Sequence, residues 1–505
     1  MYSKKIKIIK GCEQPNVKTK LKKIFNRRSN QMALDLVESG DDDESSHGKG
    51  ERVSRYLPPE VNSSMLYHDI VQIAWPSLVE FVLTQLASMV DMIMVGRLGP
   101  WAISAVGLTM QPKFLMMTMF MAMNVGATAL VARYKGEDSR IKANTVLNQA
   151  MLLTFILSLA ASVVGFIFSG PMIRFMGATD AKTLEGGTIY LKIQMIGFLF
   201  MALTSTVTAA LRGIGNSRTA MAYNLIANVV NVVFNYLLIF GHFGFPKMGI
   251  AGASLATIIG QFVAFVLAMI VILREDQYLH LQIKESLKPN WEYLKNIFNI
   301  GIPAMIEQLI MRAGMITFVK TVTSLGTIPF ATHQICMNIR AMSFMNGQAF
   351  AVSATSLMGQ SLGKKRPDMA QAYCSRTRRI GMTISLLLGL VFFFFGKPIM
   401  KLYTDNTLII EQGTKILKLV ALIQPFQSTQ FILSGALRGA GDTKATAIIT
   451  FITVLLLRPG LAKFTINSLD WGLKGAWIAI AADQVVRSLL IVMRYRSGKW
   501  KNIKI

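Results

Sequence analysis

Four acidic residues lie inside long apolar stretches of the chain: Glu80, Asp91, Glu307 and Asp483. A charge at the centre of a bilayer costs about 3 kcal/mol on insertion scales, so each carboxylate is a candidate for binding or transport chemistry. No nucleophile elbow, phosphate-binding loop or HExxH motif accompanies them, and the three cysteines lack metal-binding spacing. The sequence therefore predicts a protein that is not an enzyme and that uses no metal or other cofactor.

Two sets of polar residues are expected to lie on helix faces. Glu80 and Asp91 are 11 residues apart, which leaves only about 20° between them at the helical advance of about 100° per residue. Four asparagines recur at spacings of 4, 3 and 4: Asn224, Asn228, Asn231 and Asn235. Such amides either line a binding site or join packed membrane helices, and the spacing is compatible with both.

The elements that must carry these residues are membrane-spanning helices. Of the 505 residues, 52% are hydrophobic and 16% are charged, whereas soluble domains are about 25% charged. The net charge of +26 could indicate nucleic-acid binding, but the basic residues lie between long apolar runs and no base-stacking motif is present. We therefore expect a lipid bilayer as the environment and no nucleic-acid partner.

Twelve apolar stretches are long enough to cross a hydrocarbon core of about 30 Å. They are expected near residues 67–95, 101–132, 143–169, 187–211, 218–240, 249–273, 292–320, 328–360, 370–396, 412–437, 444–466 and 472–495. The predicted fold class is all-α integral membrane, with two pseudo-symmetric six-helix bundles (66–273 and 292–496) around a central cleft. A cytoplasmic linker (274–291), a tail expected to be disordered (1–65) and a basic end (497–505) complete the chain.

The basic residues also predict the orientation in the membrane. Most lysines and arginines fall in the tail, in alternate gaps between the expected helices and at the C-terminal end. The positive-inside rule places these segments in the cytoplasm. We therefore expect a multi-pass protein of the plasma membrane with both termini cytoplasmic.

An internal repeat relates the two halves. Aligned positions include Trp75 with Ile302, Glu80 with Glu307, Lys113 with Arg340, and Gly136 with Gly363. The stretch ALRGIGNSRTA (210–220) also returns as ALRGAGDTKAT (436–446). Repeated halves of parallel topology are a recurring design of secondary transporters, which hold substrate between the halves. The alternative is a duplicated scaffold that transports nothing.

Several separated stretches resemble one known family. The motifs are VDMIMVGRLG (90–99), ALRGIGN (210–216), GIAGASLAT (249–257), ATHQICMNIRAMSF (331–344) and SATSLMGQSLG (353–363). They look like the multidrug and toxic compound extrusion (MATE) family, most like its DinF-like bacterial branch, over roughly residues 66–495. The resemblance implies a V-shaped pair of six-helix bundles that exports compounds in exchange for protons or sodium.

The resemblance also implies a candidate cation-coupling site. Asp91 matches the first-helix aspartate of the family, and Thr257 matches a threonine that faces the same cavity. Asp91 has no acidic counterpart in the second half, where the repeat places Phe318, as expected for a specialised residue. With Asn231 and Asn235 these residues form the predicted site. Because residue 235, often an aspartate in the family, is asparagine here, we favour proton over sodium coupling. A simply hydrated or capping aspartate is the alternative.

Two buried ion pairs are expected near the midplane. Glu80 and Lys113 lie at similar depths in successive helices, and Glu307 and Arg340 repeat them in the second half. Because a lone buried charge is costly, we predict the pairs Glu80–Lys113 and Glu307–Arg340, which would gate the central cleft or contact substrate. The family often has an acid where Arg340 stands, and Arg312 adds another buried cation. This departure argues against the usual cationic-drug specificity.

Further candidates for substrate contact are Arg312, Met117 and Gln261. Met117 belongs to a methionine-rich run (116–123) that suits an adaptable wall, although ordinary packing explains most methionines. The expected function is secondary antiport of a drug or metabolite, with a small-molecule substrate and a coupling cation as partners. The runner-up is a flippase for lipid-linked intermediates, which a longer row of basic cavity residues would favour. A channel or a membrane enzyme fits less well.

Overall fold

The computed structural model of the chain describes residues 62–178, 180–282 and 288–503. The predicted tail (1–65) lies almost wholly outside the described residues, as does part of the linker. Helices and short connections make up the described part of the chain, which contains no strand. The predicted all-α membrane fold is confirmed in this respect.

Six long helices form the first half. They are α2 (Ser63–Gly96), α3 (Pro100–Gly136), α4 (Arg140–Ile167), α6 (Ala181–Gly213), α7 (Ser217–Phe240) and α8 (Gly249–Ile272), with the short α5 (Ser169–Phe175) and η2 (His242–Gly244) between them. Asparagine or aspartate caps several of these helices. Asn62 accepts a hydrogen bond from the Ser64 N–H, and Asp180 accepts one from the Thr183 N–H. Each satisfies a donor that the first helical turn leaves free.

The second half repeats the pattern. Its elements are α10 (Trp291–Thr323), α11 (Thr327–Gly363), α12 (Pro367–Lys401), α13 (Thr407–Gly439), α14 (Thr443–Thr450), η3 (Phe451–Leu457), α15 (Arg458–Asn467), α16 (Gly472–Arg496) and η4 (Lys499–Asn502). The sequence predicted one regular helix over 444–466. Instead α14, the π-helical η3 and α15 follow one another as a single span. A π-helical turn is rare and is frequently found at functional sites.

Eleven spans in the described residues are long and apolar enough to cross a membrane, by length and composition alone. The remaining long helix, α11, has 37 residues, as many as α3. It is richer than α3 in serine, threonine, asparagine and glutamine, which lowers its hydropathy. With α11, twelve long spans of the described residues form the two bundles, one of them made of α14, η3 and α15.

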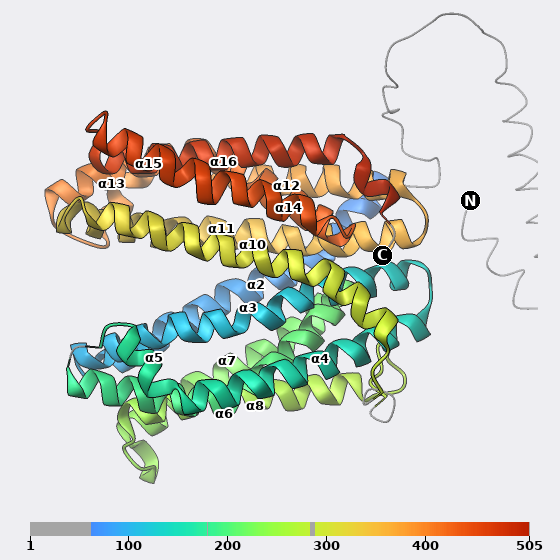
Figure 1. Cartoon of the computed structure of the whole chain (residues 1–505), viewed down its shortest axis with the longest axis horizontal. Coiled ribbons are helices and arrows are strands. Elements are labelled where there is room, and N and C mark those ends of the chain that lie inside the picture. Colours follow the sequence, from blue (N-terminus) through green and yellow to red (C-terminus); the bar gives the residue numbers. More distant parts are fainter. Residues whose placement is uncertain (1–61, 179, 283–287, 504–505) are drawn as a thin grey trace, which may run out of the picture. The chain divides into compact units, whose positions relative to one another are not determined.

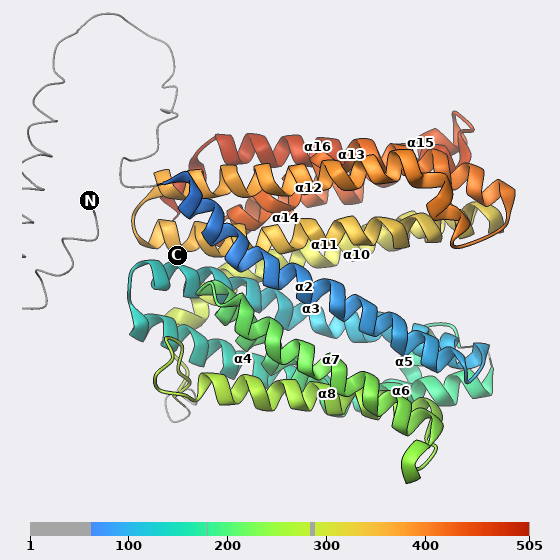
Figure 2. The ribbon, with the colours of Figure 1, turned by 180° about the vertical axis from the view of Figure 1, so that it is seen from behind.

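The first helix of each half packs against the other half. The two bundles lie beside each other in Figures 1 and 2, with α2 and α10 running along their junction. In α2, Leu66 and Ile70 belong to an apolar cluster with α11, α12 and α13 of the second half. In α10, Ile297 and Ile300 belong to a cluster with α3, α4 and α6 of the first half. Tilting one half against the other must therefore move α2 and α10.

Close helix contact joins the halves at one end of α3 and α11. A Cβ atom on Gly136 would lie 2.0 Å from the Gln360 carbonyl oxygen, and one on Gly363 would lie 2.0 Å from that of Arg133. Gln360 Nε2 also donates to the Gly213 carbonyl of α6 at 2.9 Å. Only glycine allows the two backbones to approach so closely. The repeated glycines thus close the junction at the ends of α3 and α11 that precede residues 137 and 364.

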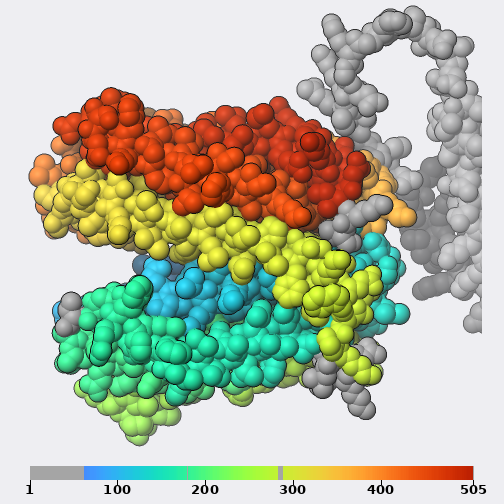
Figure 3. All heavy atoms as spheres, viewed as in Figure 1, coloured from blue at the N-terminus to red at the C-terminus, as the bar shows by residue number. Residues whose placement is uncertain are grey.

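A groove also lies between the halves, which touch again where the Arg312 guanidinium of α10 packs on the Phe114 ring of α3. In the space-filling view of Figure 3 it runs between α10 (yellow) and the helices of the first half, with blue atoms of the chain visible at its floor. A small cavity of about 210 Å³ also lies between the halves, and both Arg212 and Arg438 line it. The polar residues predicted from the sequence lie in the two bundles on either side of this groove.

Candidate functional site

A row of contacts joins one face of α2 to the asparagine stripe of α7. Asn224 Nδ2 donates to Glu80 Oε1 at 2.8 Å, and Asn228 Nδ2 donates to Thr84 Oγ1 at 3.0 Å. Farther along, Asn235 Nδ2 donates to Asp91 Oδ1 at 2.5 Å. The prediction that Glu80 and Asp91 share one helix face is confirmed. The asparagine spacing therefore places the amides opposite that face.

The four residues of the predicted cation-coupling site lie together in the first half. Besides the contact between Asn235 and Asp91, Asn231 Nδ2 lies 3.4 Å from Thr257 Oγ1 of α8. With its amide turned over, Asn231 places Nδ2 3.0 Å from both carboxylate oxygens of Asp91 and accepts from the Thr257 N–H. The choice of amide orientation follows from the hydrogen-bond network. In either orientation the side chains that hydrogen-bond to Asp91 in the described residues are neutral. The ammonium group of Lys113 attracts the carboxylate electrostatically without forming an ion pair with it.

The predicted ion pair between Glu80 and Lys113 is wrong. Glu80, which is 8% exposed, binds Arg212 of α6, with 2.8 Å between Glu80 Oε2 and the guanidinium nitrogen. Lys113 instead donates to Gln194 Oε1 at 2.7 Å. Depth along a helix fixes how far a residue lies in the membrane but not the side of the helix to which it points. Lys113 points toward α6 and α8, because Gln194 in turn donates to the Ser254 carbonyl.

The second half contains an ion pair equivalent to Glu80–Arg212, and the predicted pair Glu307–Arg340 is wrong. Arg438 binds Glu307 at 2.6 Å, and Thr446 Oγ1 donates to the other oxygen of that carboxylate at 3.0 Å. Arg340, the predicted partner, donates from Nε to Gln427 Oε1 at 3.0 Å. Both acceptors of a buried carboxylate are therefore used, as burial requires. The signal was present in the sequence, since Arg212 and Arg438 occupy equivalent places in the repeated ALRG stretch.

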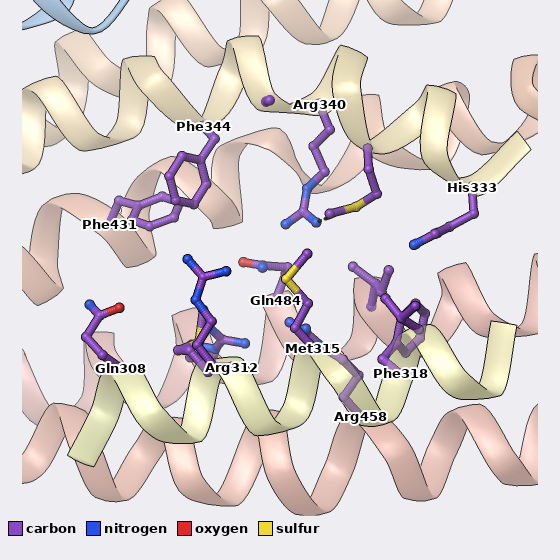
Figure 4. Close-up of a pocket in the computed structure, with 16 residues that line it drawn as sticks. Gln308, Arg312, Met315, Phe318, His333, Arg340, Phe344, Phe431, Arg458 and Gln484 are labelled. Atoms are coloured by element: carbon purple, nitrogen blue, oxygen red, sulfur yellow. Dashed lines mark hydrogen bonds between the residues drawn. The ribbon is translucent and has the colours of Figure 1, made fainter. Parts of the chain in front are cut away.

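A cavity of about 300 Å³ lies inside the second half. Its walls come mainly from α10, α11 and α16, with contributions from α13 and α15. The residues that line it are Gln308, Met311, Arg312, Met315, Phe318, Val319, His333, Met337, Arg340, Ala341, Phe344, Phe431, Arg458, Ile480, Gln484 and Arg487. Figure 4 shows Arg312 and Arg340 reaching into it from opposite helices, α10 and α11.

Two arginines that line this cavity form ion pairs with one buried acid, Asp483. Asp483 is fully buried and accepts from Arg458, both through a close contact with a terminal nitrogen and from Nε at 3.1 Å. Arg487, one helical turn farther along α16, donates to both carboxylate oxygens at 2.5 Å. Its Nε donates to Thr453 Oγ1 in the π-helical η3 at 3.2 Å. The π-helical turn and Arg458 therefore meet α16 at this cluster.

Sequence reasoning missed Arg458 and Arg487 as cavity residues. It counted Lys113, Arg312 and Arg340 as the available cavity cations, but Lys113 does not line this cavity and binds Gln194 instead. The available signal was Arg487 four residues after Asp483, a spacing that places opposite charges on one helix face. Arg458 comes directly after an apolar run in the span that precedes α16. Both arginines lie well inside the predicted helices 444–466 and 472–495.

The remaining predicted substrate contacts are divided between the halves. Arg312 lines the cavity of the second half, and its guanidinium carbon lies 3.2 Å from the centre of the Phe114 ring of α3. Met117 packs instead beside an apolar cluster of the first half that contains Phe120 and Phe198. Gln261 lies on α8, and its buried Oε1 has no partner in the described residues. Neither Met117 nor Gln261 lines the cavity.

Two repeated helical bundles, with carboxylates, amides and arginines inside them, characterise a polytopic membrane transporter. The family model for MatE matches residues 76–237 and 303–462, one match in each half and together more than half of the chain. The chain belongs to the MatE family. This confirms the resemblance drawn from its motifs, and the DinF-like branch stays a prediction.

Relatives and solved structures agree with this assignment. The chain is 29% identical over 447 residues to "Probable multidrug resistance protein NorM" of Thermotoga maritima, covering 88% of this chain and 95% of that protein. It is 28% identical over 433 residues to "Uncharacterized transporter YisQ" of Bacillus subtilis, covering 85% and 94%. The structure titled "Outward-facing conformation of a multidrug resistance MATE family transporter of the MOP superfamily" matches with a TM-score of 0.80, 21% identity and coverage of 86% and 97%. The protein is thus a multi-pass membrane transporter of small molecules and not an enzyme.

Proposed function

We propose that the protein is a secondary active antiporter of the plasma membrane that exports drugs or metabolites in exchange for protons. Both termini lie in the cytoplasm, as the distribution of basic residues predicts. The observation that carries the proposal is Asp91, a carboxylate inside a membrane helix whose hydrogen-bond partner in the described residues is the neutral amide of Asn235. A carboxylate in that setting is free to take up and release a cation.

The groups around Asp91 favour a proton. Asn231, Asn235 and Thr257 are neutral, and Asn235 Oδ1 is buried without a partner in the described residues. A protonated Asp91 gains a hydroxyl donor, which a turned Asn235 amide can accept through that oxygen. Sodium prefers several oxygens and more negative charge than one carboxylate supplies. The related names containing "multidrug resistance" support an exported drug as the substrate.

Asp91 is placed where its protonation can move the halves. It lies on α2, whose first turns pack into the second half through Leu66 and Ile70. When Asp91 is neutralised, the contact between α2 and α7 loses its charge-assisted hydrogen bond, which is roughly twice as strong as a neutral one. α2 then repacks and biases the tilt between the halves. Substrate and proton are coupled because each favours one of the two arrangements.

The described conformation is proposed to face outward. The glycine contacts of α3 and α11 close the junction at the ends that precede residues 137 and 364. The basic residues predict that the connections at these two places are cytoplasmic. The groove in Figure 3 then opens toward the other side of the membrane.

Proteoliposomes with imposed gradients test the antiport directly. The matched probes are 2-naphthalenesulfonate and trimethyl-2-naphthylammonium, which share one aromatic ring and differ in charge. We expect transport of one of them to follow a pH gradient at fixed sodium and to stop when the gradient is collapsed. Transport that follows a sodium gradient at fixed pH would contradict the choice of ion. Movement of both probes without any gradient dependence would contradict antiport.

One observation supports the second candidate, a flippase. The cavity contains four arginines, Arg312, Arg340, Arg458 and Arg487, which is the longer basic row that a phosphorylated lipid headgroup would require. The two functions differ in a single measurement. A flippase moves a fluorescent anionic lipid between leaflets of a proteoliposome, whereas the proposed antiporter leaves it in place.

A further inference from the structure

We propose that the cavity of the second half is the substrate site and that it takes an amphipathic organic anion, a carboxylate, sulfonate or phosphate ester on an aromatic or aliphatic body. This inference rests on the proposed transport function and assigns the charge of its substrate. The cavity has an excess of positive charge among the residues that line it.

Four guanidinium groups line the cavity, and a single carboxylate forms ion pairs with two of them. Asp483 binds Arg458 and Arg487. Among the described residues, no carboxylate oxygen lies within 4.0 Å of the guanidinium nitrogens of Arg312 or Arg340. Both arginines are partly buried, and a cation withdrawn from water without a counter-ion is costly. The cavity therefore holds at least two positive charges that a ligand can neutralise.

Arg340 has the geometry of a ligand-binding residue. Its Nε is fixed by Gln427 Oε1 at 3.0 Å, and one terminal nitrogen lies 3.9 Å from the Met337 sulfur. The other terminal nitrogen forms no hydrogen bond within the described residues. In Figure 4 the guanidinium group extends from α11 into the cavity, opposite Arg312 of α10. A planar guanidinium held by one edge presents the other edge to a carboxylate or sulfonate oxygen.

Two further polar groups of the cavity wall have an atom without a hydrogen-bond partner in the described residues. His333 Nδ1 and Gln484 Oε1 are buried without a hydrogen bond in the described part of the chain, and both side chains are at least 97% buried. Buried polar atoms are nearly always paired in folded proteins. Figure 4 places both side chains along the same space as Arg312 and Arg340. A ligand with polar atoms next to its charge would satisfy them.

The rest of the wall suits an apolar body. The rings of Phe344 and Phe431 meet edge to face with centroids 4.7 Å apart. Met315 and Phe318 face the space from α10. The volume of about 300 Å³ is at the lower end of the usual range for small-molecule sites. An aromatic group bearing one acidic substituent therefore matches both the size and the chemistry of the cavity.

Binding of matched probes to the purified full-length protein tests the inference. The probes are 2-naphthalenesulfonate, the neutral 2-naphthalenesulfonamide and trimethyl-2-naphthylammonium, in nanodiscs of phosphatidylcholine. We expect the anion to bind at least tenfold more tightly than the other two. Arg340→Gln should weaken the anion at least tenfold, Arg340→Lys should restore part of the affinity, and Arg312→Gln should also weaken it. Arg379→Gln, at an exposed position on α12, is the matched control and should bind as the wild type does.

The outcomes separate this inference from the transport function. Tighter binding of the cation, or equal anion binding by wild type and Arg340→Gln in a variant with an unchanged melting temperature, overturns the anionic site. If phosphatidylglycerol displaces the probe and soluble aromatic sulfonates do not, the ligand is a lipid and the proposed soluble anion is wrong. In these cases gradient-driven transport of the cationic probe would still support antiport. Anion binding that remains without gradient-driven transport would instead contradict the antiporter and leave the site in place.

Discussion

One acid of each half, Asp91 and Asp483, lies in a setting that the other half does not repeat. Asp91 of the first half meets the neutral amide of Asn235, whereas Asp483 of the second half is held between Arg458 and Arg487. The position equivalent to Asp91 in the repeat is Phe318, which lines the arginine-rich cavity. The first half therefore has a carboxylate whose hydrogen-bond partners are neutral, and the second half has a carboxylate held between two arginines.

Other buried charges are the same in both halves. Glu80 binds Arg212 and Glu307 binds Arg438 at equivalent places, where α2 and α10 approach the junction. Repeated pairs of this kind belong to the architecture that both bundles share. The residues that differ between the halves are therefore the better candidates for coupling and for substrate binding.

The largest expected effect on stability comes from removing the negative charge of Asp483, the acid that binds two arginines in the second half. Asp483→Asn leaves two buried arginines without their counter-ion, and breaking one side of a buried ion pair costs about 3–5 kcal/mol. We expect a large fall in the melting temperature of the purified protein. Asp470→Asn, at an exposed acid before α16, is the matched control. Equal melting temperatures for the two variants would show that Asp483 does not hold this region together.

The next effect should appear in the repeated ion pairs. A double-mutant cycle with Glu80→Gln and Arg212→Gln should give a coupling energy of about 1–3 kcal/mol in the free energy of unfolding. The same cycle with Glu80→Gln and Lys113→Gln should be additive within about 0.5 kcal/mol, because these side chains bind different partners. Coupling to Lys113 in place of Arg212 would contradict the described pairing.

An effect of similar size is expected where repeated glycines join the halves. Gly136→Ala introduces a Cβ 2.0 Å from the Gln360 carbonyl oxygen, and overpacking of this kind costs about 1–3 kcal/mol. Gly107→Ala on the same helix meets no atom within 4 Å and serves as the control. Thermal melting of both variants compares them. Should Gly136→Ala melt at the wild-type temperature, α3 and α11 are not in close contact at this point.

Local patterns in the sequence predicted much of the fold and part of the site. Helix lengths, the repeat and the shared face of Glu80 and Asp91 follow from spacing along one chain segment. The partners of Glu80 and Lys113 do not, because they depend on how α2, α3 and α6 rotate against one another. The π-helical turn before Arg458 also escaped prediction, since residues 451–457 are apolar except for Thr453 and are compatible with a regular helix.

The most direct test of the account is Asp91→Asn. The variant replaces a carboxylate, whose hydrogen-bond partner is the neutral Asn235 amide, with an amide of the same shape. We therefore expect its melting temperature to stay close to that of the wild type. Transport of whichever naphthalene probe the wild type moves should no longer respond to a pH gradient in proteoliposomes, while Asp470→Asn should respond normally. An Asp91→Asn protein that still drives transport against a concentration gradient at the wild-type rate would contradict proton coupling through Asp91.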